Sequence, residues 1–167
     1  MEIKNNTTYT SNLVKEFLKV YYFDKIRVIR IIMNILILVL IVRFFILKDI
    51  NTIDIITFIF GLFGIIELNT DMIPYTNYKR LEKKKDSILN TKIKYLFKEY
   101  NFMLNNGREE FINYKDLYKV IERDDSYYLY INKYKAFIVD KSDFSKKDIQ
   151  ILTNNFKDKV STYKYIK

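Results

Sequence analysis

The chain of 167 residues contains neither histidine nor cysteine, and it has only one proline and three glycines. Without cysteine it can form no disulfide, no thiolate metal site and no thiol nucleophile. Without histidine it lacks the commonest metal ligand, the commonest general base and the usual pH switch. The scarcity of proline and glycine argues against linkers and low-complexity tracts. The metal and catalytic chemistry open to this chain is therefore narrow.

The sequence also lacks the common catalytic motifs, with no glycine-rich phosphate loop and no G-x-S-x-G nucleophile elbow. Its adjacent carboxylates are the pairs Glu109–Glu110 and Asp124–Asp125. Adjacent carboxylates in turns are usually solvated, and the second pair fits a tight turn better than a metal site. We therefore predict a protein that is not an enzyme and that holds no cofactor and no metal.

Two apolar segments lie close together in the first half of the chain. Residues 31–47 are apolar except for Asn34 and Arg43, and the segment extends back to about residue 28. A helix of about 20 apolar residues crosses about 30 Å of hydrocarbon, so residues 28–47 meet the requirement. The second segment, 53–70, has a shorter apolar core. If only the first segment crossed the membrane, however, these apolar residues would be exposed to water. We predict a transmembrane helical hairpin over residues 28–68.

A cleaved signal peptide is a weaker explanation of the first apolar segment. That segment begins near residue 28, which is late, and the bulky residues 43–46 offer no small-residue cleavage site.

The basic residues around the hairpin predict its orientation. Lysines and arginines precede the first segment and follow the second, whereas the connection between them carries only Lys48. Basic residues stay on the cytoplasmic side of a membrane. We predict a multi-pass cell-membrane protein with two spans, with both termini in the cytoplasm and residues 47–52 as a short outer turn.

Four charged residues lie in or at the predicted spans, and their spacing pairs them by depth: Arg43 with Asp54, and Arg30 with Glu67. Thirteen residues turn a helix by about 220°, so both pairs cannot lie centrally in one seam. A proton path or a sensor is one explanation. Anchoring at the membrane interfaces, with Asp54 capping a helix in the segment 51–54, is the favoured one.

The hairpin is flanked by two segments predicted to lie in the cytoplasm. Residues 1–27 form an N-terminal amphipathic segment, and residues 71–90 form a basic juxtamembrane helix. The basic cluster at Arg80 and residues 83–85 either attracts anionic lipid or serves only to fix the topology, and the second explanation is favoured.

Residues 91–167 change to a period of two, which is typical of strands. Six short runs separated by tight turns predict an antiparallel meander. A capping box, Ser145 to Asp148, then begins a helix with one apolar stripe. The predicted fold class is an α+β membrane protein, in which an N-terminal transmembrane hairpin precedes a small antiparallel β domain closed by a C-terminal helix.

This arrangement resembles the bacterial YcxB-like family over nearly the whole chain. The residues that carry the resemblance are Phe111–Glu122, Tyr127–Tyr130 and Ala136–Phe144, which follow the pattern I-x-Y-x-x-I-x-x-V-x-E, then Y-L-Y, then I-P-K-x-x-F. The chain departs from it at Leu117, in place of Ile, and at Asp140, in place of Pro. The resemblance implies a pleckstrin-homology-like (PH-like) barrel on the cytoplasmic side, and it implies no activity and no catalytic residue.

The leading functional hypothesis is a membrane-tethered interaction module. Its partner would be an anionic lipid headgroup, another protein or a second copy of the chain. Nucleic acid is disfavoured, because the 16 basic and 11 acidic residues after residue 90 are interspersed. The alternative is a small immunity or stress-response protein that acts through the hairpin itself. The candidate interaction surface consists of Tyr114, Lys115, Lys119, Lys133 and Lys135.

Overall fold

The computed structural model describes residues 2–46, 52–85 and 87–166. The chain divides into two compact units. Residues 1–14 and 88–167 form the first, which we call the β unit, and residues 15–87 form the second, the helical unit. The helical unit is therefore an insertion within the sequence of the β unit.

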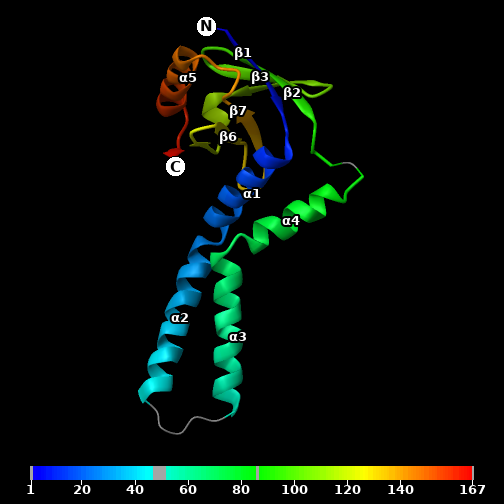
Figure 1. Cartoon of the computed structure of the whole chain (residues 1–167). Coiled ribbons are helices and arrows are strands. Elements are labelled where there is room, and N and C mark those ends of the chain that lie inside the picture. Colours follow the sequence, from blue (N-terminus) through cyan, green and yellow to red (C-terminus); the bar gives the residue numbers. More distant parts are fainter. Residues whose placement is uncertain (1, 47–51, 86, 167) are drawn as a thin grey trace. The chain divides into compact units, whose positions relative to one another are not determined.

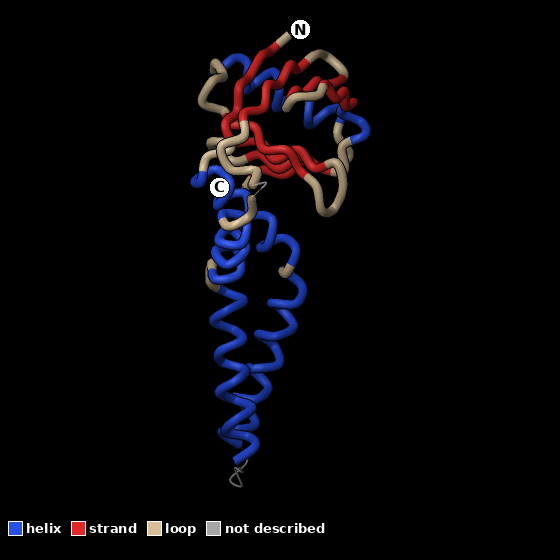
Figure 2. Tube along the Cα trace, turned by 90° about the vertical axis from the view of Figure 1, so that its right-hand side faces the viewer, coloured by secondary structure: helices blue, strands red, loops and turns tan. Residues whose placement is uncertain are grey.

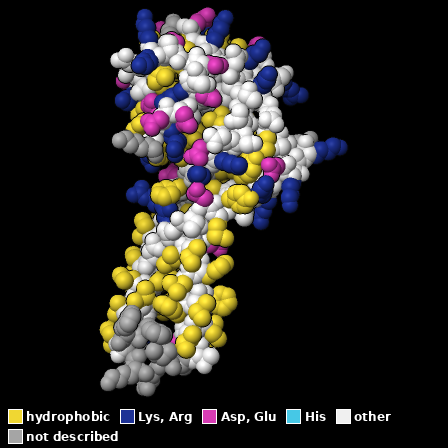
Figure 3. Space-filling model, viewed as in Figure 1, with side chains coloured by type: hydrophobic (Ala, Val, Ile, Leu, Met, Phe, Trp, Pro, Cys, Tyr) yellow, Lys and Arg dark blue, Asp and Glu magenta, His cyan; other side chains and the backbone are white. Residues whose placement is uncertain are grey.

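The helical unit is dominated by two long helices, α2 (Arg27–Ile46) and α3 (Thr52–Asn69), which lie side by side (Figure 1). Gly61 lies at their contact, where an added Cβ would approach Ile37 Cδ1 to 3.0 Å. Away from that contact both helices expose large apolar side chains, including Ile35 at 56% and Phe60 at 73% (Figure 3). Such a surface is unusual for a helix that faces water.

By length and composition, one helix of the described part of the chain, Thr52–Asn69, could cross a membrane. One such helix is a weak indication on its own. Residues 47–51 of the predicted outer turn, which include the first residue of the predicted capping segment 51–54, lie outside the described residues.

Two shorter helices flank this pair: α1 (Ser11–Lys25) and α4 (Met72–Glu82). The basic helix expected over residues 71–90 thus ends at Glu82. Lys83 is its C-cap, and a turn follows at Leu89–Asn90, where Asn90 adopts a positive φ of 63°. Asn is one of the few residues that tolerate this conformation, so the chain reverses here into the next strand.

The β unit contains two four-stranded sheets (Figure 2). Sheet A is antiparallel, in the order β1 (Ile3–Thr8), β2 (Lys92–Phe97), β3 (Asn101–Asn105), β4 (Glu109–Asn113). Sheet B has the order β7 (Ala136–Asp140), β6 (Ser126–Tyr130), β5 (Lys119–Glu122), β8 (Tyr163–Tyr165). Only β8 runs parallel to its neighbour. A 3-10 turn, η1 (Tyr114–Asp116), links the sheets, and α5 (Lys146–Lys159) precedes β8. The α+β class is confirmed, with two sheets where one curved meander was expected.

An aromatic cluster joins both sheets to α5. The Phe156 ring of α5 lies 6.3 Å from Phe97 in sheet A, 5.3 Å from Tyr127 in sheet B and 5.4 Å from Tyr114 in η1, measured between ring centroids. Phe156 is fully buried. The predicted capping box is present, since the Asp148 backbone N–H donates to Ser145 Oγ at 3.1 Å. The cap and the apolar stripe together fix α5 on the core.

The N-terminus differs from the expected separate segment 1–27. Residues 3–8 form β1, which pairs with β2 in continuous register from Ile3 opposite Phe97 to Thr8 opposite Lys92. Beyond the strands, the Tyr9 N–H donates to Thr91 O and the Asn90 N–H donates to Tyr9 O, each at 2.9 Å. The helical unit is therefore inserted between two strands that pair directly with each other.

Candidate functional site

The structure separates the five residues predicted to form an interaction surface. The predicted surface position of Tyr114 is wrong, because this residue is fully buried. Its ring stacks on Phe102, and its hydroxyl donates to Lys98 O at 2.8 Å. Burial raises the pKa of this phenol well above its ordinary value. Tyr114 thus belongs to the core, because it follows the last residue of β4 and turns inward in η1.

The lysines are accessible, and three of them share one end of sheet B. Lys119 begins β5 opposite Tyr130, the last residue of β6. Lys133 and Lys135 lie in the β6–β7 turn that follows Tyr130, and both are exposed. Lys115 is exposed on η1, where the neighbouring Tyr114 N–H donates to Tyr100 O at 3.0 Å. Lys115 therefore lies nearer to the β2–β3 turn than to the other three lysines.

The strand β1 contacts β7, an edge strand of sheet B. Side chains of β1 bind the backbone of β7. The Asn5 amide donates to Asp140 O at 2.8 Å, and Thr7 Oγ1 accepts from the Asp140 N–H at 2.9 Å. Tyr9 OH accepts from the Ile138 N–H at 2.9 Å. These bonds satisfy backbone groups that an edge strand would otherwise leave open. This role could not be inferred from the sequence, because Asn is depleted in strands and the inward-facing positions of residues 3–8 are not consistently apolar.

Tyr9 also meets Tyr95 of β2, with 3.2 Å between their hydroxyl oxygens. The Tyr95 hydroxyl donates to Ile138 O at 3.0 Å. Burial is the main reason that the pKa of each phenol is raised, because removal from water disfavours the charged form. The corner between β1 and β7 is thus held by neutral hydroxyls and amides.

A buried ion pair lies at the other end of β5 and β7. Lys141 Nζ is 2.6 Å from Glu122 Oε1, and both side chains are less than 10% exposed. Lys141 also donates to Arg123 O at 2.5 Å, and its ammonium lies 4.3 Å from the centroid of the Tyr127 ring. The strands β5 and β7 run in the same direction on either side of β6. Their final residues therefore lie at the same end of the sheet.

Hydroxyl groups complete the shell around Glu122. The Thr153 hydroxyl of α5 donates to Glu122 at 3.2 Å, and the Tyr163 hydroxyl of β8 donates to Glu122 Oε2. The Tyr127 hydroxyl and Thr153 Oγ1 are 2.8 Å apart, and burial is the main cause of a raised pKa at Tyr127. The carboxylate therefore connects β5, β7, α5 and β8. Its acceptor positions are taken by neighbours within the fold, which favours a structural role.

Two further clusters lie in the helical unit. Arg43 Nη2 is 3.1 Å from Asp54 Oδ1, so the structure places the predicted outer pair within ion-pair distance. Between Arg30 and Glu67, both among the described residues, no ion pair occurs. The Arg30 guanidinium instead lies 3.7 Å from the centroid of the Phe23 ring, about two helical turns earlier in the chain. The rotation between the two predicted pairs accounts for this difference.

A cavity of about 140 Å³ lies beside α1 and α4. Lys19 at its lining binds Glu16 at 3.0 Å and Asp71 at 3.2 Å. Hydrogen bonds to these carboxylates, to Glu16 first, raise the pKa of Lys19. The remaining lining residues are Lys15, Pro74 and Tyr75. Among residues 2–46, 52–85 and 87–166, no group of three acidic, His or Cys side chains could hold a metal ion.

One part of the chain matches a known protein family. Residues 97–154, from the end of β2 into α5, match the family model of YcxB-like protein. This segment is YcxB-like. The resemblance is confirmed over that range, which covers β3 and β4 of sheet A, β5, β6 and β7 of sheet B, and the first part of α5. No curated protein and no solved structure matches the chain.

The YcxB-like motif residues acquire positions in the fold. Glu122 ends the V-x-E element, and Lys141 is the lysine of the element read here as Val139–Asp140–Lys141. The two charged residues of the motifs are thus the two partners of the buried ion pair. Tyr114 and Phe144, the aromatic positions of the same motifs, are both buried. These YcxB-like motifs therefore mark the interior of the β unit.

Proposed function

We propose that this protein is a membrane-anchored, non-enzymatic interaction module, in which a two-span hairpin holds a PH-like domain at the inner face of the cytoplasmic membrane. The observation that carries the proposal is the pairing of β1 with β2. The chain leaves β1 at Thr8 and returns in β2 at Lys92, and these two residues are opposite each other in one ladder of the β unit.

This pairing constrains how many times the inserted segment crosses a membrane. A segment that starts and ends at adjacent residues of one folded domain starts and ends on one side of the bilayer. It can cross only an even number of times. If α3 crosses, as its length and composition allow, a second segment must cross in the opposite direction. The adjacent helix α2, with its exposed apolar side chains, is the segment that supplies it.

The distribution of basic residues supports the orientation with both termini in the cytoplasm. Basic residues precede α2 in α1, follow α3 in α4, and continue through residues 83–85. The positive-inside rule counts such residues within about 15–20 positions of a span. The ion pair between Arg43 and Asp54, at the far ends of α2 and α3, reduces the cost of placing both charges near the opposite interface.

The architecture of the β unit supports a PH-like domain with a binding role. Two antiparallel-rich sheets meet at the β1–β7 corner, and α5 packs on the shared core. Its most conspicuous buried charges, Glu122 and Lys141, neutralise each other and bind neighbouring groups of the fold. A rigid domain whose polar interior is occupied in this way acts through its surface, on lipid, on another protein or on a second copy.

Extraction of membranes with alkaline carbonate tests the anchoring. We expect the full chain to remain in the membrane pellet, because α2 and α3 would be integral to the bilayer. The matched control is a chain in which a short Gly-Ser linker joins residues 1–10 to residues 88–167, which keeps the strands and α5 of the β unit without the hairpin. We expect this control in the supernatant. Release of the full chain by carbonate would reject the proposal.

A further inference from the structure

The end of the β unit from which the inserted helices leave can be identified from contacts within that unit. Along β1, Asn5 and Thr7 bind Asp140, whereas Tyr9 binds Ile138, closer to the start of β7. β1 and β7 therefore run in opposite directions. The end of β1, where the chain leaves for α1, lies at the end of β7 that begins after the β6–β7 turn.

The β6–β7 turn at this end carries a compact basic surface. Asn132 Oδ1 accepts from the backbone N–H groups of Tyr134 and Lys135, at 2.8 and 2.9 Å, and so fixes the turn. Tyr134 is 76% exposed, with Lys133 and Lys135 exposed on either side of it. Lys119 begins the neighbouring strand β5, opposite Tyr130, at the same end of sheet B. We call Lys119, Lys133, Tyr134 and Lys135 the basic turn.

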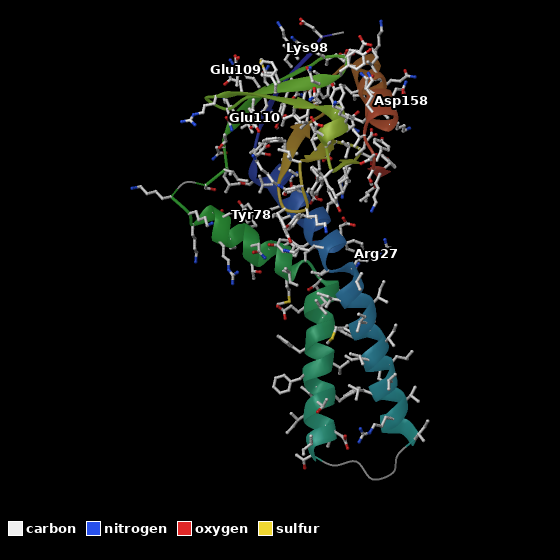
Figure 4. All side chains as sticks on the ribbon, turned by 180° about the vertical axis from the view of Figure 1, so that it is seen from behind. Arg27, Tyr78, Lys98, Glu109, Glu110 and Asp158 are labelled. Atoms are coloured by element: carbon white, nitrogen blue, oxygen red, sulfur yellow. The ribbon has the colours of Figure 1, made fainter. Side chains whose placement is uncertain are left out.

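Other parts of the β unit differ in charge or in position. The β3–β4 connection bears Arg108 beside Glu109 and Glu110, so its charge is mixed. The chain leaves for α1 at the end of β1 that pairs with Lys92, which we call the exit. The β2–β3 turn follows Phe97, which pairs with Ile3, so this turn lies at the opposite end of β1 and β2. Figure 4 shows Lys98 and Glu109 at these opposite ends of sheet A. The basic turn thus combines a single sign of charge with proximity to the exit.

We propose that the basic turn docks on the anionic lipid headgroups of the membrane in which the hairpin is anchored. The inference rests on the proposed function, because the anchor is what brings this end of the domain to a bilayer. Lysines near an anionic leaflet are attracted over about a Debye length. Tyrosine is favoured at the same depth, where its ring meets the apolar boundary and its hydroxyl stays in water. Docking would fix the orientation of the domain on the membrane and leave its opposite end free for a partner.

The absence of tryptophan from the chain provides a direct test. The Tyr134→Trp variant of the full chain would carry a single tryptophan at the basic turn. The matched control is Tyr100→Trp, in the β2–β3 turn, where the native side chain is 65% exposed. Each variant is reconstituted in phosphatidylcholine bilayers with or without phosphatidylglycerol, and a nitroxide-labelled phosphatidylcholine headgroup serves as the quencher.

We expect quenching of the Tyr134→Trp variant in bilayers that contain phosphatidylglycerol, and little quenching of the Tyr100→Trp variant. Adding Lys133→Ala and Lys135→Ala to the first variant should weaken the affinity of the turn for the membrane by about 25-fold. Each lysine removed should account for about fivefold.

Three results would overturn the inference. They are an unquenched Tyr134→Trp variant, equal quenching with and without phosphatidylglycerol, or equal quenching of the two tryptophan variants. Carbonate extraction of the same preparations separates the two ideas. A retained but unquenched Tyr134→Trp chain rejects the docking alone, whereas a chain released by carbonate rejects the anchoring as well.

Discussion

Replacing Lys141 with methionine is expected to lower the free energy of unfolding of the β unit by about 3–5 kcal/mol, which is the cost of leaving one partner of a buried pair uncompensated. Glu122 would then be a buried carboxylate without its cation, held only by the Thr153 and Tyr163 hydroxyls. Urea denaturation of the purified full chain, followed by the near-ultraviolet circular dichroism of tyrosine, measures the loss.

Two further variants make this result specific. Lys141→Met combined with Glu122→Gln removes the buried charge but keeps an acceptor oxygen, so the pair of changes should cost less than Lys141→Met alone. Lys147→Met changes an exposed lysine of α5 and should stay within about 0.5 kcal/mol of the native chain. A single Lys141→Met change as mild as Lys147→Met would show that the ion pair contributes little to stability.

Removal of β1 is expected to prevent folding of the β unit altogether. A fragment of residues 88–167 loses the burial of Ile3 and Tyr9 and leaves the Asp140 and Ile138 backbone groups without their β1 partners. Each buried apolar side chain contributes about 1.5–3 kcal/mol and each orphaned polar group costs about 1–3 kcal/mol, and together these approach the whole stability of a typical domain.

The control is again the chain in which a linker joins residues 1–10 to residues 88–167. It restores β1 beside β2, and the linker is short because Tyr9 already binds Asn90 and Thr91 through backbone hydrogen bonds. We expect a cooperative urea transition for the joined chain and none for the fragment. The same transition midpoint in both would mean that β1 is dispensable, contrary to the pairing on which the insertion argument depends.

The sequence predicted most of the strands because their chemistry is local. Alternating apolar residues and turn residues mark β2 to β7, and the Ser145 to Asp148 box marks the start of α5. The strand β1 was missed because its inward-facing positions include Asn5 and Thr7, which are buried through hydrogen bonds to β7 and not through apolar contact. Only the fold shows that these polar residues are at a sheet corner.

The buried ion pair could have been inferred in part. Glu122 ends the first strand of a meander, and Lys141 directly follows the third. The first and third strands of a meander run in the same direction, so they finish at the same end of the sheet. The sequence could not show that α5 and β8 enclose that end of the sheet. The strand β8 pairs with β5, and its Tyr163 is 41 residues from Glu122 in the sequence. Tyr114 was assigned to the surface because a period of two does not reveal where a strand gives way to a turn.

In the proposed architecture, the inserted segment crosses the membrane twice and returns the chain to its starting side. Because the chain has no cysteine, single-cysteine variants labelled in intact bacterial cells with a membrane-impermeant maleimide test it most directly. We expect the Thr52→Cys variant, at the start of α3, to be labelled from outside. The Ser161→Cys variant, exposed in the β unit, should be labelled only after the cells are permeabilised. Labelling of both variants in intact cells, or of neither, would contradict the two-span anchor.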